Sequence, residues 1–152
     1  MITQKQAVES FEKLLRNWDK NQNFTKTNVK TLVSAIHKSP NFRDYVMGAI
    51  PTEYGTQGAV DFVVGLLPLV DENKRSPLYT ILAGWYYELG DRDLAFATLY
   101  QAQALDPEYS LAKLFERVFK AGWAQEGLAN MRAELHPKVS ASVMENLDEV
   151  FA

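Results

Sequence analysis

Two pairs of carboxylates have the close spacing that acid–base catalysis uses: Asp91 with Asp93, and Asp148 with Glu149. Such a pair acts as acid and base only where burial moves the pKa values of its two members apart. Asp91 follows a glycine and precedes a periodic apolar segment, which is typical of a helix cap. We expect the second pair to be solvated. We therefore assign no catalytic residue, and an enzyme with an unrecognised acid-based site stays an alternative.

The sequence offers few residues that could form a metal site or a phosphate-binding loop. The chain contains no cysteine, and its two histidines, His37 and His136, are far apart and outside any zinc-binding spacing. We expect His37 to lie on the surface or at the end of a helix. Gly55 and Gly58 do not form a phosphate-binding sequence. We predict a non-enzymatic protein with no metal and no cofactor.

The composition is typical of one folded domain, which we expect to span residues 1–152. Of the 152 residues, 47% are hydrophobic and 23% are charged, close to the average of globular proteins. The N-terminal segment lacks the apolar stretch of a signal peptide. The longest apolar run, Val60–Val70, is interrupted by Asp61 and Pro68 and is too short to span a bilayer. We expect a soluble, cytoplasmic protein without a membrane partner.

The charge of the chain is unevenly distributed. Residues 1–38 carry seven basic and three acidic side chains, the remainder carries nine basic and sixteen acidic ones, and the net charge is -3. Lys13, Arg16 and Lys20 form a basic face on the first predicted helix, away from its apolar stripe. We interpret this face as solvated helix surface, with an acidic partner as the alternative. A nucleic-acid-associated accessory role ranks lower, because a pI of 5.4 lacks the usual basic footprint.

Apolar residues recur at helical spacing along most of the chain, which predicts an all-α fold of about seven to eight helices. Residues 1–38 are expected to form two basic N-terminal helices. The first extends over residues 3–20, with Thr3 as its N-cap. The second begins near Thr25 or Thr27 and ends before a proline, because the residue preceding a proline avoids the helical conformation.

The middle of the chain combines a helical pattern with a glycine-containing segment and a long apolar run. A third helix over residues 40–51 ends at a proline, and we expect the glycine-containing segment Thr52–Gly58 to be a loop. Val60–Val70 is apolar on nearly all sides and rich in valine, so periodicity alone does not separate a buried helix from a strand. We choose a buried helix because its surroundings are helical, and we expect Pro68 to end it early.

Three further helices are predicted after residue 109. One extends over residues 110–122, the next over residues 124–135, and Pro137 separates these from a C-terminal helix within residues 138–152. The C-terminal helix has apolar residues at helical spacing. It docks on the core, caps an open end or pairs with another copy as a homodimer, and the sequence does not separate these alternatives.

Residues 76–109 have the most specific spacing in the chain. Ser76 caps a helix whose expected left-handed C-terminal residue is Gly90. Asp91 then caps a second helix, which Asp106-Pro107 interrupts. Because the connection is short, we expect the two helices to pack antiparallel as a hairpin.

The hairpin resembles a single tetratricopeptide repeat, in which small residues let two helices approach and large ones fill the gaps. The pattern does not recur one repeat length before or after it. The resemblance implies a tetratricopeptide-like helical bundle of antiparallel helix pairs. It rests on eight positions that fit by residue class: Tyr79, Leu82, Ala83, Tyr86, Ala95, Leu99, Ala102 and Pro107.

A longer stretch, from about Val33 to Trp123, is similar to the C-terminal half of an actinobacterial family known as domain of unknown function 4192. The carrying strings are Phe42-Arg43-Asp44, Leu78–Trp85, Gly90-Asp91 and above all the run from Leu105 to Ala112, which reads LDPEYSLA. The N-terminal half of the longer family members has no counterpart in this chain. The family implies no catalytic residues.

The run Trp85-Tyr86-Tyr87 is interpreted first as packing against the preceding helix, with a binding surface as the alternative. Successive residues on a helix point about 100° apart, so we expect that they cannot all be core. The repeat pattern places Tyr86 inward, so Trp85 or Tyr87 faces either a neighbouring helix or an exposed groove. Tetratricopeptide-like proteins bind protein partners along the first helix of each pair. By that analogy, the candidate partner-binding residues are Thr80, Gly84, Trp85, Tyr87 and Glu88.

Overall fold

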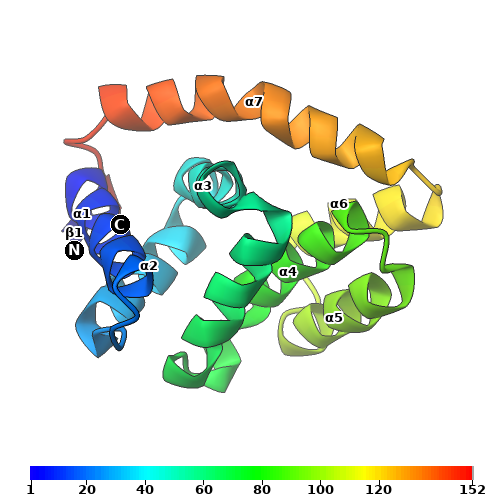
Figure 1. The fold of residues 1–152 in the computed structure, drawn as a ribbon, viewed down its shortest axis with the longest axis horizontal. Coiled ribbons are helices and arrows are strands. Elements are labelled where there is room, and N and C mark those ends of the chain that lie inside the picture. Colours follow the sequence, from blue (N-terminus) through cyan, green and yellow to red (C-terminus); the bar gives the residue numbers. More distant parts are fainter. Residues whose placement is uncertain (152) are drawn as a thin grey trace.

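In the computed structural model, which describes residues 1–151, the chain forms an all-α helical bundle (Figure 1). This confirms the predicted fold class. The described residues contain seven α-helices: α1 (Gln4–Asp19), α2 (Lys26–Lys38), α3 (Pro40–Leu66), α4 (Ser76–Glu88), α5 (Arg92–Leu105), α6 (Ser110–Lys120) and α7 (Gln125–Glu145).

The two N-terminal helices form as predicted. The Thr3 hydroxyl accepts a hydrogen bond from the N–H of Gln6, and the Gln6 side chain accepts one from the N–H of Thr3, so α1 begins with a capping box. α2 follows Thr25 and ends beside Ser39. The two helices pack against each other and bury their apolar stripes.

α3 is longer than predicted, because the interruption expected over Thr52–Gly58 is a kink at Gly55 between two helical parts rather than a loop. The helix continues through Pro51 and bends at Gly55, whose φ of 75° is the one non-helical conformation inside it. A glycine tolerates this conformation without the steric cost that a side chain would add. In a regular helix the carbonyl of Met47 would accept a hydrogen bond from the N–H of residue 51, but Pro51 has no N–H. The indole nitrogen of Trp85 donates to this carbonyl instead, at 3.3 Å.

The ambiguous segment Val60–Val70 is helical, as chosen from its surroundings. α3 includes it as far as Leu66, and Pro68 then stands in a 3-10 turn, η1 (Leu67–Leu69). A second turn, η2 (Glu72–Lys74), leads into α4. The predicted early end at Pro68 is confirmed.

α4 and α5 form the predicted hairpin. Gly90 has a φ of 83°, and an Asp91 carboxylate oxygen accepts a hydrogen bond from the N–H of Leu94 as the N-cap of α5. The expectation that Ser76 caps α4 is wrong, because Ser76 is itself helical and its hydroxyl donates to the carbonyl of Ala102. That bond joins the start of α4 to the end of α5.

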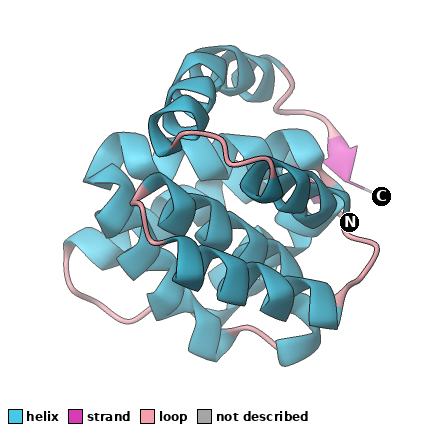
Figure 2. Ribbon diagram, turned by 90° about the vertical axis from the view of Figure 1, so that its right-hand side faces the viewer, coloured by secondary structure: helices cyan, strands magenta, loops and turns pink. Residues whose placement is uncertain are grey.

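The C-terminal part of the chain is one long helix where two were predicted. α7 continues through Pro137, so the expected separate helix in residues 138–152 is wrong. Pro137 and Ala133, whose carbonyl loses its usual intrahelical donor, are both exposed, so the missing bond leaves no buried polar group. After α7, the strand β2 (Val150–Phe151) pairs antiparallel with β1 (Ile2–Thr3) and brings the two ends of the described chain together (Figure 2).

The buried apolar residues form two clusters that meet at α4. The larger lies among α1, α2, α3 and α4 and includes Trp85, and the smaller lies among α4, α5 and α6 and includes Tyr87. α4 is therefore covered on nearly all sides. α7 crosses the outside of the bundle and lies along α3, from the α6 side to the α1 side (Figure 1).

Candidate functional site

The predicted partner-binding residues are almost completely buried, which corrects the expectation that they line an open groove. Trp85 is 0% exposed and Tyr87 is 1% exposed. Thr80 and Gly84 are also buried, and the Glu88 side chain is 4% exposed. The residue assigned inward, Tyr86, is only half-buried. The three aromatics are therefore not all core, as expected, but the inward residue was misassigned. α4 lies between two cores, so Trp85 and Tyr87 are buried on different sides and Tyr86 is the partly exposed one.

Two of the five residues, Tyr87 and Thr80, line no groove. The Tyr87 ring stacks on Phe119 of α6 with 4.4 Å between ring centroids, and its hydroxyl donates to the carbonyl of Trp123. The Thr80 hydroxyl donates to the carbonyl of Ser76 at 2.9 Å, so its polar group is satisfied within α4. These contacts are structural.

The other three, Gly84, Trp85 and Glu88, share one face of α4 and form the floor of a groove. α3 contributes Asp44 and Met47 to the same floor. α7 lies over the groove and leaves a cavity of about 90 Å³ beneath it. We call this feature the α7 groove, and its remaining lining residues are Phe115, Leu128, Met131, Arg132, Leu135, His136 and Val139.

A bidentate ion pair connects the floor of the α7 groove to its cover. Arg132 on α7 donates from Nε and Nη2 to both carboxylate oxygens of Glu88 on α4, at distances of 2.8 to 3.2 Å. The Arg132 side chain is only 15% exposed. Planar bidentate pairing combines energy with a fixed orientation, so this contact sets the position of α7 along α4.

Two glycines allow side chains to approach the helices beneath α7. A Cβ built on Gly48 of α3 would lie 2.4 Å from Nδ1 of His136, and one on Gly84 would lie 2.7 Å from the Phe115 ring. His136 also stacks on Tyr45, with 6.1 Å between centroids. Its buried Nδ1 has no hydrogen-bond partner among the described residues. Burial and, secondarily, the charge of Arg132 lower the pKa of His136.

The apolar anchoring of α7 is sparse and concentrated near its ends. Of its residues, Leu128 and Val143 are buried. Near Val143, the Gln4 side chain donates to the carbonyls of Val143 and Asn146, at 3.0 and 3.1 Å. Met131 and Leu135, in the middle of the helix, line the cavity and are also exposed. α7 therefore lies against α3 over much of its length, although few of its apolar side chains are fully buried.

The structure also brings together two strings of the resemblance to family 4192. Arg43 lies 5.9 Å from the centroid of the Tyr109 ring and donates to the Tyr109 hydroxyl at 3.4 Å. The same guanidinium pairs with Asp44, which lines the α7 groove, at 2.9 Å. Burial raises the pKa of Tyr109 despite the opposing charge of Arg43. The two strings thus meet at the edge of the groove.

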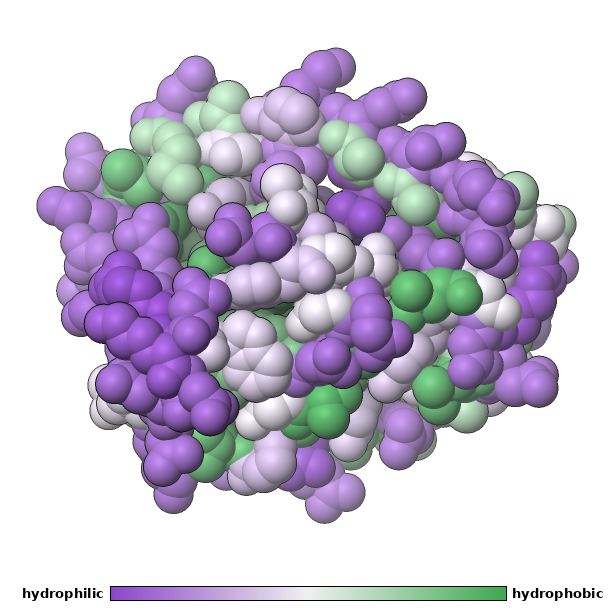
Figure 3. Space-filling model, viewed as in Figure 1, coloured by the Kyte–Doolittle hydropathy of each residue, from purple (hydrophilic) through white to green (hydrophobic). Residues whose placement is uncertain are grey.

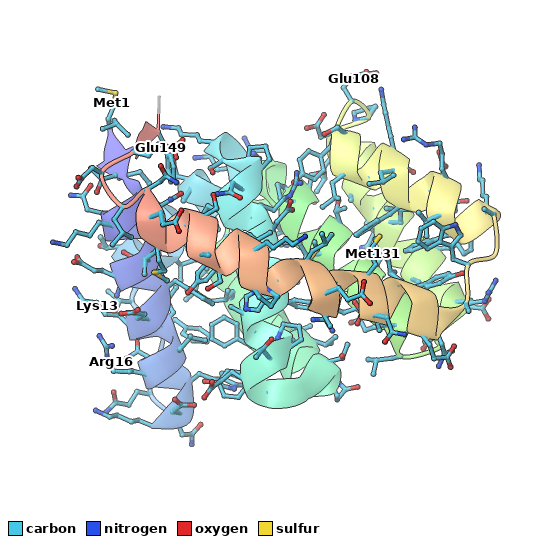
Figure 4. The ribbon with its side chains drawn as sticks, turned by 90° about the horizontal axis from the view of Figure 1, so that it is seen from above. Met1, Lys13, Arg16, Glu108, Met131 and Glu149 are labelled. Carbon is cyan, nitrogen blue, oxygen red and sulfur yellow. The ribbon has the colours of Figure 1, made fainter. Side chains whose placement is uncertain are left out.

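The basic face lies elsewhere. Lys13 and Arg16 on α1 and Lys20 directly after it are exposed and do not line the α7 groove. Figure 4 shows Lys13 and Arg16 directed away from the body of the bundle and from α7. The charges that could attract an acidic partner or nucleic acid are therefore on a different surface from the predicted partner-binding residues.

The predicted chemistry-bearing groups do not assemble into a shared site. Asp91 caps α5, as expected, and both carboxylate pairs are exposed. His37 is exposed near the end of α2, where its Nε2 lies 3.2 Å from the carbonyl of Lys74. Among residues 1–151, no three His, Cys, Asp or Glu side chains are placed to hold a metal ion together. Within the same residues, no helix combines the length and apolar character needed to cross a membrane.

Comparison with family models found no match, and no curated protein or solved structure matches the chain. The resemblances to family 4192 and to a tetratricopeptide repeat therefore stay predictions. The contact residues that sequence reasoning missed are Arg132 and His136. No local signal identifies them, because their partners on α4 and α3 are distant in sequence.

Proposed function

We propose that the chain is a non-enzymatic protein-interaction domain whose α7 groove binds an amphipathic helix. The observation that carries the proposal is that the groove already holds a helix of this chain through one buried ion pair and a few apolar anchors. A partner helix would need an arginine for Glu88 and apolar residues three or four positions away on the same face. α7 would then be the internal occupant that the partner replaces.

The tetratricopeptide-like character of the hairpin supports this choice of surface. Gly84, Trp85 and Glu88 lie on the first helix of the hairpin, which is the partner-binding side in that class of protein. The cavity of about 90 Å³ beneath α7 supports it as well, because an imperfectly filled apolar interface leaves room for a better-fitting helix.

A peptide with the sequence of residues 124–146 tests the proposal directly. Carrying a fluorophore, it should bind weakly to the full-length chain, because the chain's own α7 competes for the groove. Arg132→Glu in the chain places a second carboxylate beside Glu88 and should release α7. Binding of the wild-type peptide to this variant, measured by fluorescence anisotropy, should be at least about tenfold tighter than binding to the wild-type chain.

Lys138→Glu is the matched control, because it makes the same charge change at an exposed position of α7. It should leave peptide binding unchanged. Arg132→Gln gives a second, milder variant, and far-ultraviolet circular dichroism checks that each variant stays helical. A peptide that binds the Arg132→Glu chain no better than the wild-type chain would contradict the proposal.

Three alternatives make different predictions. A nucleic-acid role requires salt-dependent retention on nucleic acid that disappears when Lys13, Arg16 and Lys20 are neutralised. An acid-based enzyme requires a buried carboxyl with a raised pKa in a pocket. A homodimer in which two copies exchange α7 would sediment as a dimer.

A cytoplasmic location belongs to the proposal, since the cytoplasm is where we expect the partner helix.

A further inference from the structure

A second hollow, independent of the α7 groove, lies between α2 and the turns that follow α3. Its volume is about 430 Å³, within the range of roughly 300–1,000 Å³ that is usual for small-molecule sites. α2 forms one wall, and the segment from Leu69 to Lys74 forms the other. We call it the basic cleft. It has no residue in common with the α7 groove.

The floor of the basic cleft is apolar. Val29 and Val33 of α2 and Val70 of the following segment belong to the core of the bundle, and Leu69 is half-buried beside them. Their positions in the core make the floor a fixed surface. Apolar groups that enter the cleft lose contact with water, which favours binding.

The rim of the basic cleft is cationic. Lys30 and Lys38 on α2 and Lys74 on η2 are all exposed, and among residues 1–151 none of the three forms an ion pair. Asp71 is the one carboxylate among the lining residues. Lysine ammonium groups that surround an apolar floor favour an anionic group attached to an apolar one.

The two walls are connected, so the cleft is preformed. Nε2 of His37 lies 3.2 Å from the carbonyl of Lys74, which joins the end of α2 to η2. Nε of Arg75 donates to the carbonyl of Val70 at 2.9 Å and holds the base of the same segment. A preformed site loses less conformational entropy when a ligand enters it.

We propose that the basic cleft binds a small amphipathic anion, with a phosphate or carboxylate head and a short apolar tail. The tail lies against Leu69 and the small exposed parts of Val33 and Val70, and the head lies among Lys30, Lys38 and Lys74. Two features of the cleft select this chemistry together. An inorganic anion leaves the apolar floor uncovered, and a neutral hydrocarbon leaves the three ammonium groups unpaired.

Calorimetric titration of the full chain tests the proposal with octyl phosphate and octanoate, each below its aggregation concentration. Inorganic phosphate and octanol are the matched probes, because each carries only half of the proposed ligand chemistry. Either amphiphile should bind at least about tenfold more tightly than octanol and inorganic phosphate. Amide shifts of Val33, Ser34 and Val70 in nuclear magnetic resonance spectra should follow the same titration.

The triple variant Lys30→Gln/Lys38→Gln/Lys74→Gln should weaken amphiphile binding by about tenfold, since each exposed charge contributes a modest share. The control Lys13→Gln/Arg16→Gln/Lys20→Gln removes the same charge from exposed positions outside the cleft and should leave binding unchanged. Equal losses in the two triple variants, or equal binding of octyl phosphate and octanol, would overturn the proposal.

A vesicle-binding experiment distinguishes a soluble anion from a lipid head group as the ligand. Vesicles of an anionic phospholipid are mixed with the chain and sedimented, in parallel with the soluble amphiphiles. Binding of the free amphiphiles supports a soluble ligand, whereas vesicle binding that only the cleft variant loses supports a lipid head group. Failure of both overturns the inference. Neither result depends on α7, so the interaction proposed for the α7 groove is tested separately.

Discussion

Trp85 of α4 donates a hydrogen bond from its indole nitrogen to the carbonyl of Met47 on α3, at 3.3 Å. Met47 lies four residues before Pro51, which has no N–H to offer that carbonyl. The tryptophan therefore replaces the backbone donor that the proline removes, and α3 continues through Pro51 without a buried, unsatisfied carbonyl.

This relationship predicts a dependence between the two positions. Trp85→Phe should lower the free energy of unfolding by about 2–3 kcal/mol, because it removes the hydrogen bond and part of a buried side chain. In a Pro51→Ala background the alanine N–H can bond to Met47, so the same substitution should cost about 1 kcal/mol less. Urea denaturation of all four proteins measures the difference. Equal costs in the two backgrounds would show that the hydrogen bond does not matter.

The Glu88–Arg132 pair predicts an asymmetry between single and double substitutions. Arg132→Leu leaves the Glu88 carboxylate buried without a partner and should lower the free energy of unfolding by about 3 kcal/mol. Glu88→Leu/Arg132→Leu should recover most of this loss, because no charge is then left unpaired. Chemical denaturation provides the measurement.

A matched control for that experiment is the exposed pair of Lys113 and Glu108, at 2.7 Å. Lys113→Leu should leave the free energy of unfolding almost unchanged, because water solvates the remaining carboxylate. If both arginine and lysine substitutions have equally small effects, the Glu88–Arg132 pair does not hold α7.

Two glycines should respond oppositely to alanine. Gly48→Ala places a Cβ against the His136 ring and should lower the free energy of unfolding by about 1–3 kcal/mol. Gly127→Ala, on α7 with no atom within 4 Å of its added Cβ, should raise it by about 0.5–1 kcal/mol through helix propensity. Thermal unfolding of the two variants compares them. A harmless Gly48→Ala would mean that α7 does not depend on close contact there.

His136 predicts a pH dependence of α7 docking. Burial and the charge of Arg132 lower its folded-state pKa below the ordinary value of 6.5. His136 therefore binds a proton less readily in the folded chain than in the unfolded chain. Neutral His136 makes its full contribution to the free energy of unfolding above pH 6.5. It declines as the pH falls below that value and levels off below the folded-state pKa.

Hydrogen exchange of the α7 amides across this range measures the effect, and His136→Gln should remove the pH dependence. Asp44, Glu88 and Arg132 line the same groove, so each variant is compared with the wild type at matched ionic strength. An unchanged pH profile in His136→Gln would assign the dependence to another group.

Tyr87→Ala should act on stability rather than on partner binding. The ring is buried and stacked on Phe119, so truncation should lower the free energy of unfolding by about 3–5 kcal/mol. Tyr87→Phe keeps the stack and removes only the hydrogen bond to Trp123, at a cost of about 1 kcal/mol. Circular dichroism melts distinguish the two. A fully stable Tyr87→Ala would contradict the burial of this residue.

Local chemistry in the sequence was sufficient for the parts of the fold that short-range interactions decide. Thr3 and Asp91 are N-caps because their side chains bond to backbone groups three residues further along the chain. Gly90 adopts a left-handed conformation because it has no side chain to oppose it. The same is true of the apolar stripes of α1 and α2, whose period fixes the buried face of each of these helices. These features give the all-α class and the hairpin of α4 and α5.

Local reasoning was right about Pro68 but failed at two other prolines. Pro51 and Pro137 were both expected to end helices, yet α3 and α7 continue through them. In α3 the reason is a donor on another helix, Trp85, and in α7 it is exposure of the affected backbone. Neither circumstance is encoded in the residues next to the proline.

Only the tertiary structure decided which residues of α4 are buried and which of them line a groove. By itself the sequence determined a hairpin with a glycine, an aromatic pair and a glutamate on its first helix, residues suited to a binding surface. Packing then buried Tyr87 against α6 and placed α7 over Gly84, Trp85 and Glu88. The physical reason is that burial depends on contacts between residues distant in sequence, such as Glu88 with Arg132, which periodicity along one helix does not contain.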